Sequence, residues 1–264
     1  MWVWEFTQDG SAEQIAETLA ANHLGVVVKT HDGVDWMSKY DDVDGAVAGP
    51  HSVEFLAAVF ERAGVPFHAW CVPKGIDPVA EAQMAADVLA AGALSLTLDI
   101  EPYDEFWTGT ADDAQRFGDE LRTRSPYGRV DISIDPRPWM LLQIPMREFV
   151  EFADGIQPQI YWDLFNNDDN VTAYSYMGYP PGAGGLTPEF LLETTQQLLT
   201  PYDRWLIPVG EGAPLYADAW PRFAHRAWEL GMRELSVWRY GTATTAVMQY
   251  LAANTAGPEP AFAA

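Results

Sequence analysis

Short runs of strand-forming residues alternate with longer helix-like segments along almost the whole chain. Eight such runs lie at residues 2–6, 25–30, 67–72, 94–101, 129–135, 156–162, 205–210 and 234–240. This alternation is typical of a parallel sheet in which each strand is followed by its own crossover helix.

The segments between these runs carry amphipathic patterns with helix caps. Ser11 precedes a predicted helix at 11–23, and Asp77 precedes Pro78 at the start of another at 77–92. Further helices are predicted at 52–64, 110–124, 145–155, 187–200 and 216–231. About eight β/α units in 264 residues predict a single-domain (β/α)8 TIM barrel, a fold of roughly 250 residues.

No linker or low-complexity stretch divides the chain. We therefore expect one barrel domain over residues 1–253 and a flexible tail over 254–264. Two long loops, at 31–50 and 163–185, follow the carboxyl ends of predicted strands, the face where TIM-barrel active sites lie. Their aromatic residues suit stacking on sugar rings or anchoring of the loops themselves.

Charge narrows the classes of partner. Lys and Arg total 15 against 38 Asp and Glu, a formal net charge of -23, which disfavours nucleic acid and anionic membrane surfaces. The single cysteine, Cys71, forms no intramolecular disulfide and no cysteine-type zinc site. We expect a soluble protein with no cofactor and no metal, and no signal peptide or membrane span in the chain as written. The compartment and the oligomeric state stay open.

The run LSLTLDIE at 94–101 is the most informative part of the chain. Alternation places Leu94, Leu96, Leu98 and Ile100 toward the helices, and Ser95, Thr97, Asp99 and Glu101 toward the barrel lumen. Two carboxylates two residues apart on one strand face have Cα atoms roughly 6.6 Å apart. That proximity separates their pKa values, as glycoside hydrolysis requires. Asp99 and Glu101 are thus the candidate catalytic residues; pairing with an arginine or capping of a loop is the alternative.

The second strand ends with Lys29 and His31, which share one face if alternation continues. Lys29 would hold an acidic partner ionised or form a buried ion pair. His31 would contact substrate or a metal, or be a solvated loop residue, which we favour.

Other strand ends supply further binding candidates. Asp135 precedes Pro136, and it either supports the catalytic pair, acts from the nucleophile side or starts a turn. Asp131, on the same strand face, is expected deeper in the lumen. On one face of the sixth strand, the polar residues are Gln157, Gln159, Tyr161 and Asp163; we expect Gln159 and Tyr161 to bind a sugar.

Aromatic and acidic residues complete the predicted rim. Ser236, Trp238 and Tyr240 share one face of the last strand, and Trp238 is suited to be the floor for a sugar ring or a core residue. Trp70 on the third strand has the same two interpretations. Glu5 and Glu211 are further rim carboxylates, either of which would serve as the base in place of Asp99.

Three motifs resemble the family 25 glycoside hydrolases, the lysozyme-like muramidases. They are VVVKTHDG, similar to that family's Lys-Ala-Thr-x-Gly, LTLDIE, similar to its Leu-Asp-x-Glu, and SVWRYG, similar to its Trp-Gln-Tyr. The resemblance implies Glu101 as the catalytic acid, Asp99 as its partner, and Lys29 and Trp238 as site-lining groups. Where that family has Asp-Val-Ser, with the Asp in its active site, this chain has Trp-Glu-Phe, so Glu5 is at most a substitute for that Asp. Two further departures are Arg239, which stands where the family has a glutamine, and PQIYW, which stands where it has an Ala-x-Tyr pattern.

A weaker resemblance is to the family 18 chitinases, whose fourth strand ends in Asp-x-Asp-x-Glu and whose sixth carries Met-x-Tyr-Asp. Thr97 stands at the first Asp position here, and QIYWD places its acid one residue late.

The sequence therefore predicts an O-glycosyl hydrolase, retaining or inverting, that cleaves a β-linked glycan, N-acetylated or not, by carboxylate acid/base catalysis. The net charge favours a neutral glycan over an anionic cell-wall polymer. The alternative is a catalytically inactive barrel that binds carbohydrate or protein through aromatic rim loops. A metal-dependent hydrolase using Asp99, Glu101, Asp135 and His31 is a third hypothesis, disfavoured because the chain has no His-x-His or Glu-x-x-His pair.

Overall fold

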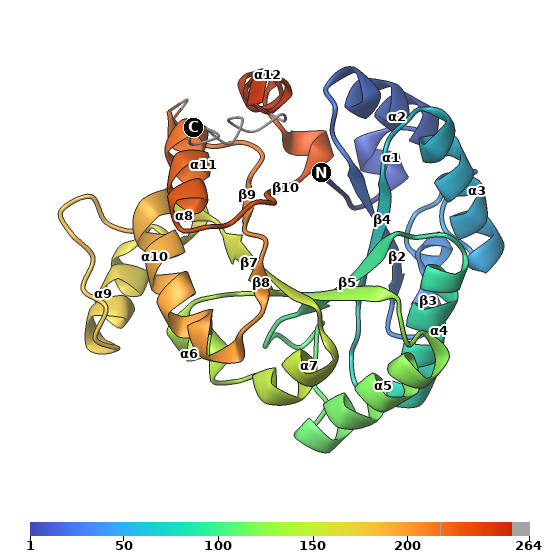
Figure 1. The fold of residues 1–264 in the computed structure, drawn as a ribbon, viewed down its shortest axis with the longest axis horizontal. Coiled ribbons are helices and arrows are strands. Elements are labelled where there is room, and N and C mark those ends of the chain that lie inside the picture. The colour runs from blue at the N-terminus through green and yellow to red at the C-terminus, as the bar shows by residue number, and fades with distance from the viewer. Residues whose placement is uncertain (217, 255–264) are drawn as a thin grey trace, which may run out of the picture.

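A computed structural model describes residues 1–216 and 218–254 of the chain. Its parallel strands follow the order β1-β2-β4-β5-β6-β7-β9-β10, and helices surround them (Figure 1). The two end strands of this order meet through a hydrogen bond from Trp2 Nε1 to Ser236 Oγ, 2.6 Å long. This nearly closed arrangement confirms the predicted (β/α)8 barrel.

The barrel strands lie close to their predicted positions. Their bounds are β1 Trp2–Val3, β2 Val26–Asp32, β4 Phe67–Val72, β5 Ser95–Ile100, β6 Arg129–Ile134, β7 Gly155–Ile160, β9 Val209–Glu211 and β10 Ser236–Trp238. Two short strands lie off this path: β3, Asp35–Trp36, pairs antiparallel with β2, and β8, Trp205–Leu206, pairs with β7. The one strand expected at 205–210 is divided into β8 and β9 around Pro208, which has no N–H to donate to a ladder.

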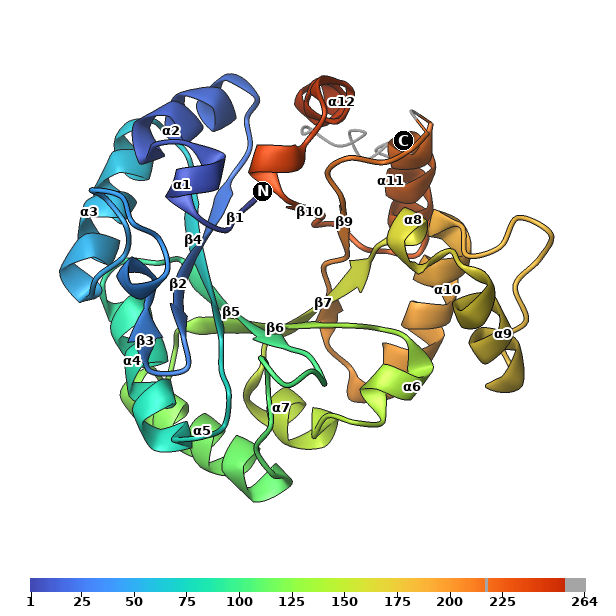
Figure 2. The same ribbon diagram turned by 180° about the vertical axis from the view of Figure 1, so that it is seen from behind.

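The helices cover the outside of the strands, as the reverse view shows (Figure 2). They are α1 Phe6–Asp9, α2 Ala12–Ala21, α3 Pro50–Arg62, α4 Pro78–Ala90, α5 Ala111–Arg124, α6 Pro138–Leu141, α7 Met146–Phe152, α8 Trp162–Phe165, α9 Asp168–Tyr176, α10 Pro188–Leu199, α11 Ala219–Glu229 and α12 Thr245–Asn254. The predicted caps are present: Ser11 closes a capping box with Gln14, and Asp77 accepts a hydrogen bond from the Ala80 amide. Residue 217 of the predicted 216–231 helix and residues 255–264 of the predicted tail lie outside the described residues.

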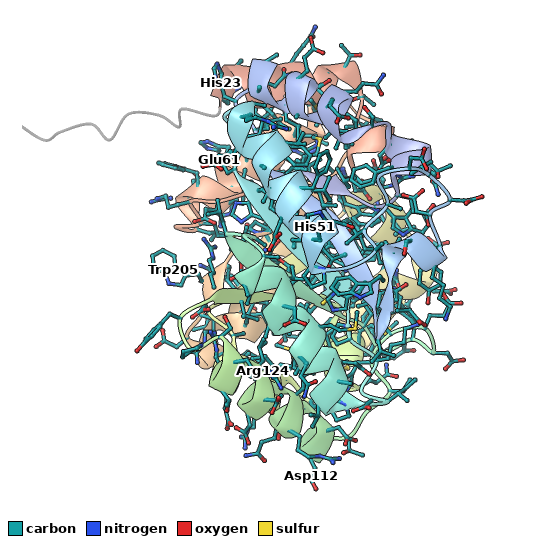
Figure 3. All side chains as sticks on the ribbon, turned by 90° about the vertical axis from the view of Figure 1, so that its right-hand side faces the viewer. His23, His51, Glu61, Asp112, Arg124 and Trp205 are labelled. Carbon is teal, nitrogen blue, oxygen red and sulfur yellow. The ribbon has the colours of Figure 1, made fainter. Side chains whose placement is uncertain are left out.

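The apolar core lies between the strands and the helices. Leu96, Leu98 and Ile100 of β5 are fully buried there, as alternation predicts. Leu94 is 61% exposed, contrary to expectation, because β5 begins only at Ser95. Charged side chains such as Asp112 and Arg124 point outward from the helices (Figure 3).

The first predicted strand is shorter than expected, because β1 ends at Val3 and α1 begins at Phe6. Asp41, from the long loop after β2, accepts hydrogen bonds from the amides of Phe6 (2.6 Å) and Thr7 (3.1 Å). This contact with a distant loop holds the start of a helix where local alternation predicted a strand. Among the described residues, no helix has the length and apolar character needed to span a lipid bilayer.

Candidate active site

Polar side chains fill the barrel lumen in layers between β5, β6 and β7. In the deeper layer, Gln157 Nε2 donates to Thr97 Oγ1 at 2.9 Å and to Asp131 Oδ2 at 3.2 Å. The alternation predicted for these strands places all three side chains inward, with Asp131 deep in the lumen.

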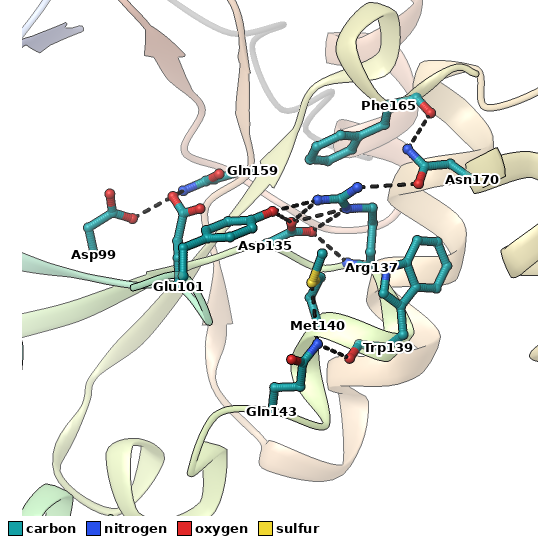
Figure 4. A network of polar contacts seen from close by, with 11 residues as sticks. Asp99, Glu101, Asp135, Arg137, Trp139, Met140, Gln143, Gln159, Phe165 and Asn170 are labelled. Atoms are coloured by element: carbon teal, nitrogen blue, oxygen red, sulfur yellow. Dashed lines mark hydrogen bonds and ion pairs between the residues drawn. The ribbon is translucent and has the colours of Figure 1, made fainter. Parts of the chain in front are cut away.

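The next layer toward the carboxyl ends of the strands holds the two candidate catalytic carboxylates. Gln159 Nε2 lies 3.1 Å from Asp99 Oδ1 and 2.8 Å from Glu101 Oε1 (Figure 4). Ser133 Oγ lies 3.2 Å from the same nitrogen. One amide nitrogen thus connects both carboxylates. The structure therefore brings together the pair that alternation on β5 predicted.

The surroundings of this pair disfavour its negative charges unequally. Burial raises the pKa of Asp99 to about 6, against the opposing effects of hydrogen bonds from Ser133 and Gln159 and of the Lys29 charge. Burial, followed by the nearby Asp99 charge, raises the pKa of Glu101 to about 8. Near pH 7 the pair therefore holds a protonated Glu101 beside an ionised Asp99, which is a division into acid and base.

A cavity of about 770 Å³ opens above the pair at the carboxyl ends of the strands. Of the residues predicted to form the site, those that line it are Glu5, Lys29, Trp70, Asp99, Glu101, Asp135, Gln159, Tyr161 and Trp238. The hydroxyl of Tyr161 makes no hydrogen bond to any other described residue, and burial keeps its pKa well above the usual range. It is therefore a neutral donor available to a ligand.

Three tryptophans form the floor of the cavity. The ring centroids lie 5.1 Å apart for Trp2 and Trp70, 5.7 Å for Trp2 and Trp238, and 5.6 Å for Trp70 and Trp238. Trp70 is buried and donates from Nε1 to the Val3 carbonyl at 2.9 Å, which fixes the orientation of its ring. Trp238 is half-buried and presents part of its indole to the cavity. Such rings are suited to stack against a sugar.

Lys29 lies beside these rings and is paired with a carboxylate that alternation did not predict. Its Nζ lies 3.0 Å from Asp32 Oδ1 and 4.9 Å from the centroid of Trp70. The register of β2 against β4 shifts between Lys29 and His31, a bulge that inserts one residue and reverses the following alternation. Asp32 therefore faces the cavity, and His31 does not share the face of Lys29.

His31 is buried at 1% exposure beside Trp36 and Thr30, so its prediction as a solvated loop histidine is wrong. Burial lowers the pKa of His31 to about 3. The imidazole is therefore a neutral packing group. The described residues contain no group of three or more His, Cys, Asp and Glu side chains placed to hold a metal ion.

Asp135 is held in a network at the cavity wall (Figure 4). Arg137 Nε lies 3.0 Å from both carboxylate oxygens of Asp135, and Arg137 Nη2 donates to Tyr103 Oη at 2.8 Å. The guanidinium also bonds Asn170 Oδ1 at 3.3 Å and lies 4.5 Å from the centroid of Phe165. Asp135 therefore holds the Arg137 guanidinium near Glu101.

The remaining rim candidates differ in position. Glu5 is half-buried, lines the cavity and accepts a hydrogen bond from Gln8 Nε2 at 2.6 Å. Glu211 does not line it; its carboxylate accepts from the amides of Asp163 (3.2 Å) and Leu164 (3.0 Å). Burial raises the pKa of Glu211 to about 7.

Two residues that alternation predicted to face the lumen lie beyond the ends of their strands and do not face it. The strand β10 stops at Trp238, and Tyr240 lies in the 3₁₀ helix Tyr240–Thr242, outside the cavity lining. The strand β7 stops at Ile160, and Asp163 in α8 accepts a hydrogen bond from the Leu215 amide at 2.6 Å instead of facing the lumen.

Several residues that line the cavity were not predicted from the sequence: Trp2, Trp4, Asp32, Lys74, Tyr103, Phe106, Arg137, Phe165 and Asn170. Trp2 and Trp4 share one face of a two-residue alternation, a signal that was available. Tyr103 and Arg137 lie beyond the ends of strands, where no sequence period specifies direction, and Asn170 lies in α9, whose place over the cavity depends on tertiary packing.

No known protein family and no curated protein matches the chain at a significant level. Solved structures do resemble it. A class V chitinase from Pseudomonas fluorescens Pf-5 has a TM-score of 0.61 at 10% identity, over 95% of this chain and 97% of its own. The catalytic domain of a chitinase from Pyrococcus furiosus has a TM-score of 0.59 at 10% identity, over 96% and 93%.

A protein described as an α-L-fucosidase from Bacteroides thetaiotaomicron has a TM-score of 0.58 at 9% identity, over 92% of this chain and 85% of its own. At such low identities these likenesses show the fold alone. The chain thus has the TIM-barrel fold that these three proteins share. The likenesses to the two chitinases support the resemblance to the family 18 chitinases at the level of fold. The resemblance to the family 25 glycoside hydrolases rests on the sequence motifs alone.

Proposed function

We propose that this protein is a glycoside hydrolase that cleaves a neutral, β-linked glycan, with N-acetylated glycans as the first class to test. One observation carries the proposal: Asp99 and Glu101 lie together at the base of an aromatic-floored cavity, and their surroundings raise the pKa of Glu101 above that of Asp99. Glycoside hydrolysis needs one protonated and one ionised carboxyl group at the scissile bond.

In the proposed reaction Glu101 gives its proton to the glycosidic oxygen as the bond from that oxygen to the anomeric carbon breaks. The carboxylate of Asp99 stabilises the positive charge that develops on the sugar. Glu101, now ionised, takes a proton from the water that attacks the anomeric carbon. The proton balance is closed, and both carboxyl groups return to their starting states.

The spacing of the pair favours retention of the anomeric configuration. Both accepting oxygens bond to one nitrogen, so they lie no more than about 6 Å apart, whereas inverting pairs are about 6.5–9.5 Å apart to admit a water. We therefore propose that the water attacks from the side of Glu101, after the leaving group has departed, and not from the side of Asp99.

The cavity supports binding of an uncharged sugar. Trp238 supplies a stacking face, and the Tyr161 hydroxyl supplies a neutral hydrogen-bond donor. Two of the three cationic side chains that line the cavity are already paired, Lys29 with Asp32 and Arg137 with Asp135. An anionic substrate would compete with these pairs.

The test compares wild type with Glu101→Gln on a panel of β-linked glycans, with release of reducing ends as the readout. Loss of general acid catalysis is expected to cost about 10²–10⁴-fold in kcat. Glu61→Gln is the control, because Glu61 is an exposed carboxylate on α3, away from the cavity (Figure 3). Unchanged turnover by Glu101→Gln would overturn the assignment.

The same panel tests the binding-only alternative. A barrel that only binds glycan would retain it without releasing reducing ends, and binding would survive Asp99→Asn with Glu101→Gln but not Trp238→Ala.

A further inference from the structure

The amide of Gln159 occupies an unusual place, because its nitrogen lies within hydrogen-bond distance of both Asp99 and Glu101. We propose that Gln159 is a positioning residue that holds these two carboxyl groups in place through its amide hydrogens, and that it does not bind substrate. The proposal deepens the proposed function of this site. It changes the sequence-based expectation for Gln159, which was direct hydrogen bonding to a sugar.

The donors and acceptors around Gln159 support this role. A primary amide has two N–H donors, and three oxygens lie within 3.2 Å of Nε2: Asp99 Oδ1, Glu101 Oε1 and Ser133 Oγ. The Ser133 hydroxyl donates to Asp99. The Ser133 oxygen also accepts from the Gln159 nitrogen, so the two amide hydrogens are shared among these three acceptors and neither is free for a sugar hydroxyl.

The amide orientation follows from the same contacts. If the oxygen and nitrogen of Gln159 were exchanged, the amide oxygen would face the Asp99 carboxylate, and two acceptors would oppose each other. Gln159 is also only 6% exposed, so little of it is available to a ligand in the cavity. Both facts fit a residue that acts through its neighbours.

A neutral donor suits this position better than a cation would. A lysine or arginine between the carboxylates would favour the ionised form of both and leave no acid to protonate a leaving group. An amide connects the two groups by hydrogen bonds while adding no net charge. It therefore constrains their positions and still permits one of them to remain protonated.

Other charged and titratable groups face the pair and stay in place when Gln159 is changed. Lys29 and Asp32, from β2, act on Asp99. Asp135 and Arg137, from the chain after β6, act on Glu101. The hydroxyls of Tyr161 and Tyr103 lie near the same carboxylates. A change in titration on loss of the amide is then attributable to Gln159.

The chain offers a matched control one layer deeper. Gln157 lies on the same strand and the same face, and it makes two side-chain hydrogen bonds, to Thr97 and Asp131, without contacting Asp99 or Glu101. Gln157→Leu removes an equal amount of polarity from the lumen. It leaves the donor to the carboxylate pair intact.

The experiment titrates the carboxyl carbons of ¹³C-labelled Asp and Glu by NMR in wild type, Gln159→Leu, Gln159→Met and Gln157→Leu. Gln159→Met keeps the side-chain length and guards against a packing defect. Loss of the amide removes a donor from both carboxylates, so both apparent pKa values should rise, by about one pH unit. Gln157→Leu should leave them within a few tenths of the wild-type values.

Kinetics on a cleaved glycan adds a second readout. A positioning role predicts that kcat falls at least tenfold, that KM stays within twofold, and that the pH profile moves to higher pH. A rise in KM with an unchanged pH profile would instead show that Gln159 binds substrate and would overturn the proposal. Equal titration shifts in the Gln157 and Gln159 variants would overturn it too. If wild type cleaves no glycan, the proposed function fails, and the NMR titration still decides the role of Gln159.

Discussion

Replacement of Lys29 by methionine tests the electrostatics of the cavity floor. Lys29 and Asp32 form an ion pair with Nζ 3.0 Å from Oδ1, and the side chains are 8% and 17% exposed. Methionine preserves the aliphatic stem but leaves the Asp32 carboxylate unpaired in a poorly solvated place. Breaking a buried pair on one side costs about 3–5 kcal/mol, and the residual exposure of Asp32 places the expectation at about 3 kcal/mol.

The assay is urea unfolding at pH 7, followed by tryptophan fluorescence. Lys39→Met is the control, because Lys39 and Asp35 form an exposed ion pair at 2.6 Å whose loss should change the free energy of unfolding little. The double variant Lys29→Met with Asp32→Asn should recover most of the lost stability, since the unpaired charge is then gone. Equal effects of the two single lysine variants would refute the reasoning.

Further predictions concern activity. Because the Lys29 charge lowers the pKa of Asp99, Lys29→Met should also move the acidic limb of the kcat/KM profile to higher pH. In wild type kcat/KM should fall below about pH 6, where Asp99 gains a proton, and above about pH 8, where Glu101 loses its proton. A kcat/KM that rises steadily from pH 6 to pH 8 and beyond would contradict the assignment. Trp238→Ala should raise KM about tenfold, or ~1.4 kcal/mol, through loss of stacking, measured against Trp228→Ala on the outer face of α11. Proton NMR of the first product should show the anomer of the substrate, whereas the opposite anomer would exclude the retaining spacing.

Alternation within strands predicted the central part of the site. Thr97, Asp99, Gln157 and Gln159 lie in the lumen as a period of two residues requires, because β5, β6 and β7 are regular parallel ladders. Helix caps at Ser11 and Asp77 were equally local, and both are present. Where backbone geometry is repetitive, the sequence is sufficient to place a side chain.

Predictions failed where that repetition stops. Because of the bulge after Lys29, Asp32 faces the cavity and His31 does not. Because β7 ends at Ile160 and β10 ends at Trp238, Asp163 and Tyr240 do not face the cavity. Such irregularities depend on contacts with distant segments. One example is Asp41, which accepts hydrogen bonds from the first backbone amides of α1. The network around Arg137 belongs to the same class, because its partners come from distant segments: Tyr103 from the loop after β5 and Asn170 from α9.

The central claim is that Glu101 is the acid that protonates the leaving group. It is tested most directly by comparing Glu101→Gln with wild type on two substrates of the same sugar, a natural glycan and a dinitrophenyl glycoside. Dinitrophenolate departs without protonation, so the variant should lose about 10²–10⁴-fold in kcat/KM on the glycan but little in the step that releases dinitrophenolate. Equal losses on both substrates would contradict the assignment of Glu101 as the acid.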